Sequence, residues 1–140
     1  MSLKFLLDTN ILSEPLRPAP NAKILRRLER HGAELATAAI VWHELWFGCL
    51  RLPPSAKREA IERYLTEVIA PTIPVLAYDT AVADCPAVER ARLAELGLTP
   101  PFADGQMAAI ASVNELTLVT LNTADYARFK HLQLTDWQST

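Results

Sequence analysis

Short apolar segments typical of buried strands alternate along this chain with longer segments of helical periodicity. The strand candidates are residues 4–7, 34–38, 73–77, 116–121 and 132–135. Strands that alternate with helices pair in parallel, because each helix carries the chain back across the sheet. The sequence therefore predicts an α/β fold with a mostly parallel sheet and helices on both faces.

The segments between these strands carry the apolar spacing or the end signals of helices. The candidates are a turn at 11–16, helices at 19–31, 40–50, 79–97, 104–114 and 123–129, and one that follows Ser55. The helix after Ser55 should bury Ile61, Leu65, Val68 and Ile69 on one face. Pro86 is expected to break the helix at 79–97.

Composition favours a folded protein over a disordered or low-complexity segment. The chain has 140 residues, of which 50% are hydrophobic and 21% charged, so one domain spanning residues 1–140 is expected. Its net charge of −2 argues against a general polyanion-coating protein but leaves room for a local basic groove. No apolar run approaches the roughly 20 residues that span a bilayer. We expect a cytoplasmic protein with no membrane contact.

The two cysteines, Cys49 and Cys85, match no metal-binding or redox spacing. Two reduced, buried thiols are therefore preferred to a disulfide.

Polar residues follow the strand candidates at the positions where parallel sheets gather ligands. Asp8 follows the first strand, Glu44 lies in the helix after the second, and Asp104 opens the helix at 104–114. Asn122 and Asp125 follow the fourth strand. Because ligands of open α/β sheets bind beyond the carboxyl ends of the strands, these side chains are expected to meet at one edge.

Three converging carboxylates repel one another strongly. Two like charges about 4 Å apart repel by about 4 kcal/mol at an effective dielectric constant of 20, so such acids protonate, separate or bind a cation. Carboxylate oxygens completed by water suit Mg²⁺, with Mn²⁺ as a possible substitute. Taken singly, each acid has a simpler role, since a lone Asp after a strand usually caps a turn and Asp104 alone fits a helix N-cap.

Four segments in order resemble the PIN domain family, particularly the VapC-type toxins of bacterial toxin–antitoxin pairs. They are Phe-Leu-Leu-Asp-Thr-Asn-Ile-Leu at 5–12, Thr-Ala-Ala-Ile-Val-Trp-His-Glu-Leu-Trp-Phe-Gly at 37–48, Pro-Phe-Ala-Asp-Gly-Gln-Met-Ala-Ala-Ile-Ala at 101–111, and Thr-Leu-Val-Thr-Leu-Asn-Thr-Ala-Asp-Tyr at 117–126. The resemblance covers essentially the entire chain.

The resemblance implies a three-layer α/β/α sandwich that hydrolyses RNA by metal-activated water. Asp8, Glu44 and Asp104 match the family's acidic metal-binding positions, and Asn122 stands where many relatives carry a fourth acid. We expect catalysis to depend on these four residues and on Mg²⁺. The resemblance also implies an RNA substrate, a homodimer and a cognate VapB-like antitoxin that blocks the acidic site.

Three further residues are expected to support the site. Thr9 and Asn10 match the motif around the first acid, with Asn10 orienting Asp8 or a water and Thr9 holding the turn. Asp125 is expected to contribute through water or to cap the short helix after the fourth strand. The chain departs from the family where Ala38 and Val41 replace hydroxyl residues and where Leu121 replaces an Arg.

Two rival functions stay open at this point. An Asp-nucleophile phosphatase would also end its first strand at Asp8, although such enzymes usually carry a second Asp where Asn10 stands. A non-catalytic RNA-binding or antitoxin-docking module would use the acids only for structure.

Two groups of basic residues are candidates for phosphate contacts, although solvated surface is the default for both. The first is Arg26, Arg27 and Arg30; the second is Arg51, Lys57, Arg58 and Arg63. The second group is the preferred candidate because it follows the segment that carries Glu44.

Overall fold

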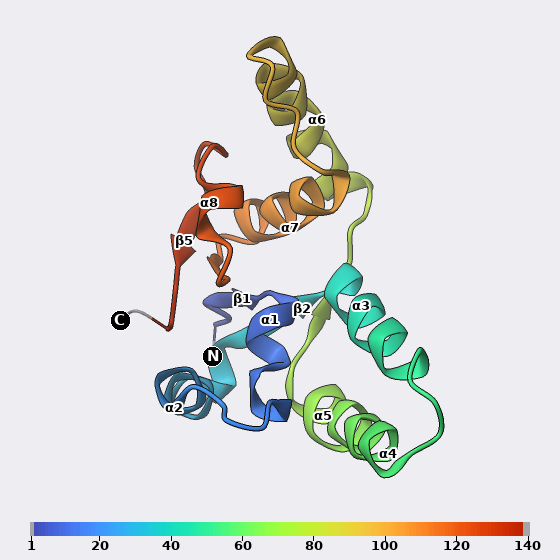
Figure 1. Ribbon diagram of the computed structural model, residues 1–140. Coiled ribbons are helices and arrows are strands. Elements are labelled where there is room, and N and C mark those ends of the chain that lie inside the picture. The colour runs from blue at the N-terminus through green and yellow to red at the C-terminus, as the bar shows by residue number, and fades with distance from the viewer. Residues whose placement is uncertain (1, 139–140) are drawn as a thin grey trace.

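The protein is built around a five-stranded sheet in the order β3-β2-β1-β4-β5 (Figure 1). The computed structural model describes residues 2–138, apart from the side chains of Cys85 and Pro86. The strands are β1 (Phe5–Leu7), β2 (Leu35–Ala38), β3 (Val75–Leu76), β4 (Thr117–Val119) and β5 (Gln133–Thr135). All four strand pairings are parallel, which confirms the predicted α/β class.

The strand order explains why helices cover both faces of the sheet. The chain runs from β1 outward through β2 to β3, then returns to β4 beside β1 and continues to β5. Because parallel crossovers are right-handed, the two directions of travel place their helices on opposite faces. The result is the three-layer α/β/α arrangement visible in Figure 1.

The first half of the chain supplies the helices of one face. They are α1 (Thr9–Leu12), η1 (Glu14–Leu16), α2 (Ala22–Arg30), η2 (Gly32–Glu34), α3 (Ala39–Leu50), α4 (Ala56–Arg63), the π-helical η3 (Tyr64–Ile69) and α5 (Ala70–Thr72). The second half supplies α6 (Thr80–Glu95), α7 (Phe102–Val113) and α8 (Thr123–Tyr126). Helix α6 packs against α7 and extends away from the sheet (Figure 1).

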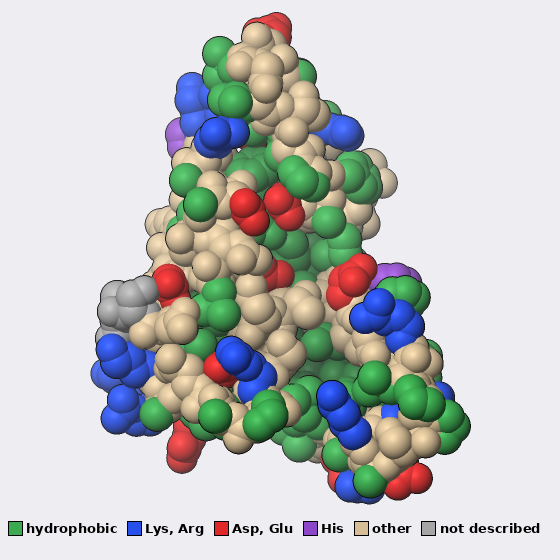
Figure 2. Space-filling model, in the orientation of Figure 1, with side chains coloured by type: hydrophobic (Ala, Val, Ile, Leu, Met, Phe, Trp, Pro, Cys, Tyr) green, Lys and Arg blue, Asp and Glu red, His purple; other side chains and the backbone are tan. Residues whose placement is uncertain are grey.

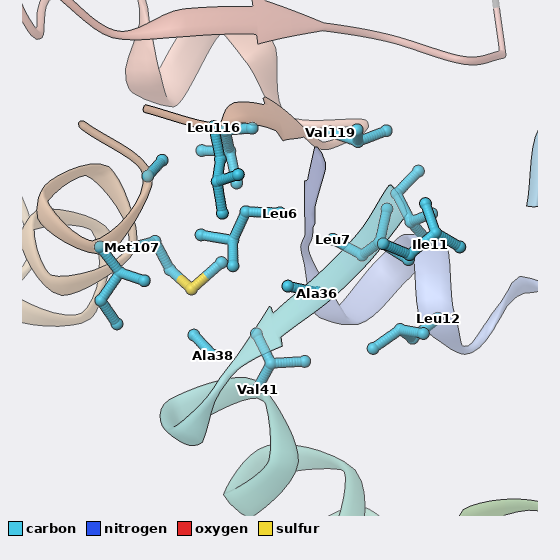
Figure 3. Close-up of a cluster of buried hydrophobic side chains, with 14 of the residues drawn as sticks. Leu6, Leu7, Ile11, Leu12, Ala36, Ala38, Val41, Met107, Leu116 and Val119 are labelled. Atoms are coloured by element: carbon cyan, nitrogen blue, oxygen red, sulfur yellow. The ribbon is translucent and has the colours of Figure 1, made fainter. Parts of the chain in front are cut away.

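Alternate residues of the central strand β1 feed the two halves of the core. Leu6 points toward Met107 of α7, whereas Leu7 points toward Ile11 and Leu12 of α1 (Figure 3). All five side chains are at most 3% exposed to solvent. Full burial of a side chain of this kind stabilises the folded state by about 1.5–3 kcal/mol. The side chains of β1 therefore hold both helical layers to the sheet.

Two expectations about the helices are wrong. Helix α6 runs as one element from Thr80 to Glu95 across position 86, because a proline removes only one of its backbone hydrogen bonds. Val68 is 51% exposed, although Leu65 and Ile69 are buried as predicted. The π-helical winding of η3 breaks the 3.6-residue periodicity on which the prediction for Val68 depended.

The Cys49 thiol is free and buried, as expected, whereas the expectation for the Cys85 thiol lies outside the described side chains. Within residues 2–138, no helix has the length and apolar character needed to cross a membrane.

Candidate active site

The site is organised by the parallel pair β1 and β4, where the chain reverses its direction across the sheet. Leu7 of β1 lies opposite Val119 of β4, and the backbone N–H of Asp8 donates to the carbonyl of Val119 over 3.0 Å. The first residue beyond β1 is therefore held against the end of β4. This is the switch point at which open α/β sheets bind ligands.

Two donors fix the carboxylate of Asp8. The backbone N–H of Thr9 donates to Oδ1 over 2.8 Å, and the hydroxyl of Thr120 donates to Oδ2 over 2.8 Å. Thr120 is fully buried, and its own Oγ1 accepts the backbone N–H of Asn122 over 3.0 Å. A continuous chain of hydrogen bonds thus joins the loop after β4 to the first acid.

The remaining acids line the same cleft from three other elements. Glu44 lies on the exposed side of α3, Asp104 is the third residue of α7, and Asp125 lies in α8. Figure 2 shows carboxylates gathered over the hollowed region between α7, α1 and α3. The cleft has a volume of about 460 Å³. It is lined by Asp8, Thr9, Asn10, Ser13, Ile40, Val41, Glu44, Ala103, Asp104, Met107, Asn122, Asp125 and Tyr126.

Asp104 is not the N-cap residue of its helix, which is the role that it would have if it acted alone. Helix α7 begins two residues earlier than predicted, with Pro101 at the N-cap position, so Asp104 lies inside the first turn. The positive end of the helix dipole favours a carboxylate there by about 0.3–1 kcal/mol.

Burial and the negative charge of the cleft raise the pKa values of Asp104 and Tyr126, which line it. Burial raises the pKa of Asp104, and the carboxylates of Asp125 and Asp8 raise it further. The hydroxyl of Tyr126 lies 3.5 Å from Oδ1 of Asp104 and acts in the opposite direction. Burial, followed by the charges of Asp8 and Asp104, also raises the pKa of Tyr126, so this phenol stays protonated and available as a donor.

No residue that lines the cleft is a Lys, Arg or His, so the protein does not neutralise these acids there. Within the described part of the chain, no three His, Cys, Asp or Glu side chains lie close enough together to enclose a metal ion. The acids therefore surround one cleft without forming a closed cage. This fits Mg²⁺, which usually binds one or two carboxylates and keeps several waters or substrate oxygens.

The residues expected to support the site, and Asn122, make different hydrogen bonds. Thr9 contributes its backbone N–H to Asp8, whereas the side-chain oxygen of Asn10 accepts the backbone N–H of Leu121 over 3.4 Å. Asn10 thus connects α1 with the loop after β4, and its expected role in orienting Asp8 or a water stays a prediction. Asn122 occupies the N-cap position of α8 without a side-chain capping bond.

Thr120 contacts the first acid directly, although the sequence alone did not single it out. It belongs to the fourth of the quoted segments, directly after β4, but a Thr at a strand end is an ordinary residue for a sheet. One sequence signal could have found it: Thr120 lies at the end of the fourth strand, two residues before the candidate Asn122, just as Asp8 lies at the end of the first strand.

The fold and the site together describe an α/β/α sandwich with an all-parallel sheet and an acidic cleft at the switch point of that sheet. The family model described as the PIN domain matches residues 5–132, nearly the full length. The chain belongs to the PIN domain family.

Known proteins of this family resemble the chain over most of its length. Toxin FitB of Neisseria gonorrhoeae is 34% identical over 124 residues, which cover 86% of this chain and 89% of FitB. The tRNA(fMet)-specific endonuclease VapC of Shigella flexneri is 31% identical over 136 residues, covering 96% of this chain and 98% of that protein.

Solved structures agree with these sequence comparisons. A structure of FitAB bound to a DNA fragment superposes with a TM-score of 0.89 at 28% identity, covering 97% of this chain and 96% of that chain. DNA-bound VapBC from Salmonella typhimurium gives a TM-score of 0.83 at 28% identity, covering 96% of this chain and 98% of that one. The chain is therefore similar to VapC-type toxins in both sequence and fold.

Proposed function

We propose that the protein is a divalent-metal-dependent endoribonuclease and the toxin of a VapBC-type toxin–antitoxin pair. The observation that carries the proposal is a cleft at the β1–β4 switch point that Asp8, Glu44, Asp104 and Asp125 line and that no Lys, Arg or His lines. The similarity to an endonuclease that is named as specific for tRNA(fMet) supports RNA as the substrate.

Asp8 and Asp104 would hold the ion most directly in this proposal, and Glu44 lines the same cleft from α3. Mg²⁺, when bound, supplies Lewis-acid activation of water and neutralises charge on the phosphate under attack. The chain's own residues do the positioning. The backbone N–H of Thr9 and the hydroxyl of Thr120 each donate to a different oxygen of Asp8. These two hydrogen bonds fix the carboxylate and leave one lone pair free on each oxygen.

The protonated phenol of Tyr126 and the backbone around Asn122 complete the cleft beside Asp104. In-line hydrolysis by water would leave 5′-phosphate and 3′-hydroxyl ends and would not need the ribose 2′-hydroxyl. A phosphatase or a purely structural acidic cluster would release no such ends.

The proposed partner is a cognate antitoxin, and the proposed state of the toxin is a homodimer. FitAB and VapBC structures, which pair a toxin with a second protein, superpose on the chain over almost its full length. A cationic side chain of an antitoxin would find four carboxylates and no competing cation in the cleft. Co-expression followed by size-exclusion chromatography with light scattering tests both statements.

Incubation of antitoxin-free protein with total RNA, with and without Mg²⁺, tests the enzymatic proposal. Cleavage that requires the ion and leaves 5′-phosphate ends supports it. RNA binding without cleavage at any Mg²⁺ or Mn²⁺ concentration contradicts it and favours a docking module. Release of inorganic phosphate without new RNA ends favours a phosphatase.

A further inference from the structure

Helix α2 carries a cationic stripe that the proposed active site does not use. Arg26 and Arg27 follow Lys23 by three and four residues, and Arg30 follows Arg26 by four, which places all four cations on one face of the helix. Lys23, Arg26 and Arg30 are exposed, and Glu29 is the only acid on the helix. Figure 2 shows basic side chains gathered over this edge of the molecule, on the same face as the acidic cleft.

No ion pair neutralises the stripe, although the exposed Glu29 lies beside it. Among the ion pairs of residues 2–138, none involves Lys23, Arg26, Arg27 or Arg30. Like charges at these spacings destabilise a helix, so the arrangement does not serve helix stability. Arg27 and Arg30 lie in the last turn, where the dipole favours cations, but Lys23 lies in the first turn, where it disfavours them.

The second basic group, which the sequence analysis preferred, is different. On α4, Nε of Arg58 pairs with Glu62 over 3.2 Å, and its guanidinium also donates to the carbonyl of Leu52. Glu59 and Glu62 offset two of the three cations of this helix, although Lys57 and Arg63 form none of the ion pairs found among residues 2–138. The excess of cations over acids is therefore larger on α2, with four cations and one acid, than on α4, with three cations and two acids.

Helix α2 is also held in a fixed position relative to the cleft. Its N-cap, Asn21, accepts the backbone N–H groups of Lys23 and Ile24. The backbone N–H of Asn21 donates over 2.9 Å to the carboxylate of Glu14, which is 2% exposed and lies in η1 directly after α1. Because α1 starts at Asp8, the stripe and the first acid belong to one continuous, anchored segment.

We propose that the α2 stripe binds the phosphate backbone of the RNA substrate at a distance from the cleft. The inference rests on the proposed ribonuclease function. The carboxylates of the cleft repel a polyanion, and no Lys or Arg lines the cleft, so a cationic surface outside it would favour the approach of RNA. The stripe supplies unpaired cations on a rigid element of the same face.

The chemistry of α2 favours RNA over a protein or a membrane surface. Protein interfaces have apolar, often aromatic centres, whereas nucleic-acid interfaces are polar and strongly positive. The apolar residues of α2 turn inward, since Ile24 is fully buried and Leu28 packs against the core. The outward face thus offers four cations and one acid, Glu29, and the residues that line it include no large apolar anchor for a protein or a lipid.

The test removes three exposed cations from α2 through the triple variant Lys23→Gln, Arg26→Gln and Arg30→Gln. A matched control removes the same charge elsewhere through Lys57→Gln, Arg63→Gln and Lys130→Gln, all at exposed positions. Gln keeps high helix propensity, and circular dichroism checks that both variants fold. The probe is fluorescein-labelled bulk tRNA in EDTA, so that binding is read without cleavage.

The α2 variant should bind at least about tenfold more weakly than the control near 0.1 M salt, and the slope of log Kd against log salt should fall by about 2. With Mg²⁺ present, KM for RNA should rise while kcat stays unchanged. Equal losses in both variants, or no loss in either, would overturn the proposal. Equally tight binding of poly-L-glutamate by wild-type protein would also overturn it, in favour of an acidic protein partner.

These outcomes are separate from failure of the proposed function. If the wild-type protein cleaves RNA and the α2 variant binds RNA as tightly as the control, only the RNA-binding role of the stripe is disproved. Wild-type protein that cleaves no RNA with any metal disproves the ribonuclease function and, with it, the role of the stripe in substrate binding.

Discussion

The hydroxyl of Thr120 donates a 2.8 Å hydrogen bond to Oδ2 of Asp8, joining residues that are 112 positions apart in the sequence. The bond crosses from the end of β4 to the end of β1, the two strands at which the sheet changes direction. It occupies one side of the carboxylate and so sets the direction in which the remaining lone pairs point. Asp8 is thereby oriented before any ligand arrives.

Replacement of Thr120 by Val should lower cleavage while the fold persists. Val has nearly the same shape but lacks the hydroxyl, so Asp8 loses a donor and the backbone N–H of Asn122 loses an acceptor. Loss of such an orienting partner typically reduces metal affinity or activity by about 10–100-fold. Cleavage rates at several Mg²⁺ concentrations measure the effect.

The variant Thr120→Ser is the matched control, since it keeps the hydroxyl. It should retain most of the activity. Equal activity of the Val variant and wild type would mean that the hydrogen bond does not matter for the site.

Replacement of Asp104 by Asn should stabilise the metal-free protein while it removes activity. Burial and the carboxylates of Asp125 and Asp8 raise the pKa of Asp104, so its ionised form costs stability in the folded state. The amide removes this charge and keeps the shape. Thermal unfolding in EDTA at neutral pH should show a melting temperature a few degrees higher than that of wild type.

The pH dependence of this effect has a definite sign. A carboxyl group whose folded pKa is raised binds its proton more tightly in the folded state, so its stability penalty is complete above that pKa and disappears as the pH falls. The gain from Asp104→Asn should therefore shrink toward acidic pH. The exposed acid Asp84, replaced by Asn, is the control and should show no comparable gain.

Glu34 is expected to have the opposite pH dependence. Hydrogen bonds from Lys4 and His31 lower the pKa of Glu34, and the Lys4 Nζ lies 2.9 Å from its carboxylate. A carboxyl group with a lowered folded pKa stabilises the fold above its unfolded pKa and loses that contribution as the pH falls through the folded value. Glu34→Gln should thus lower the melting temperature at neutral pH, and the difference should vanish in acid.

Thermal unfolding from neutral pH to below the ordinary pKa of a Glu side chain measures this convergence. A gap between wild type and Glu34→Gln that stays constant over this range would contradict the assigned ion pairs.

Replacement of Tyr64 by Phe should destabilise the fold without affecting the chemistry. Its hydroxyl donates over 2.6 Å to the carbonyl of Leu12 at the end of α1, and burial raises the pKa of Tyr64 to about 12. The Phe variant leaves this carbonyl without its partner, which costs about 1–3 kcal/mol when the group is buried. Denaturant unfolding measures the loss, and unchanged stability would mean that water replaces the hydroxyl.

The sequence predicted the parts of the fold that depend on local patterns. The alternation of apolar runs and helical periodicity gave the parallel sheet, and the steps of four at Val41, Leu45 and Cys49 identified the buried side of α3. The four acids were found because each lies in the loop or helix that follows a strand or at the start of a helix, and parallel topology then brings such positions to one edge.

The remaining features depend on tertiary contacts that no local pattern encodes. The π-helical η3 exposes Val68 because its backbone does not follow the usual helical period. The link between Thr120 and Asp8 arises only when β1 and β4 pair.

The most direct test of the acidic cleft compares RNA cleavage by wild type, Asp8→Asn and Asp104→Asn across a Mg²⁺ titration. Each Asn variant keeps the shape of its side chain but removes one charge of the cleft. We predict Mg²⁺-dependent cleavage by wild type and none by either folded variant. Full cleavage by both variants, or wild-type cleavage that persists in EDTA, would contradict the account.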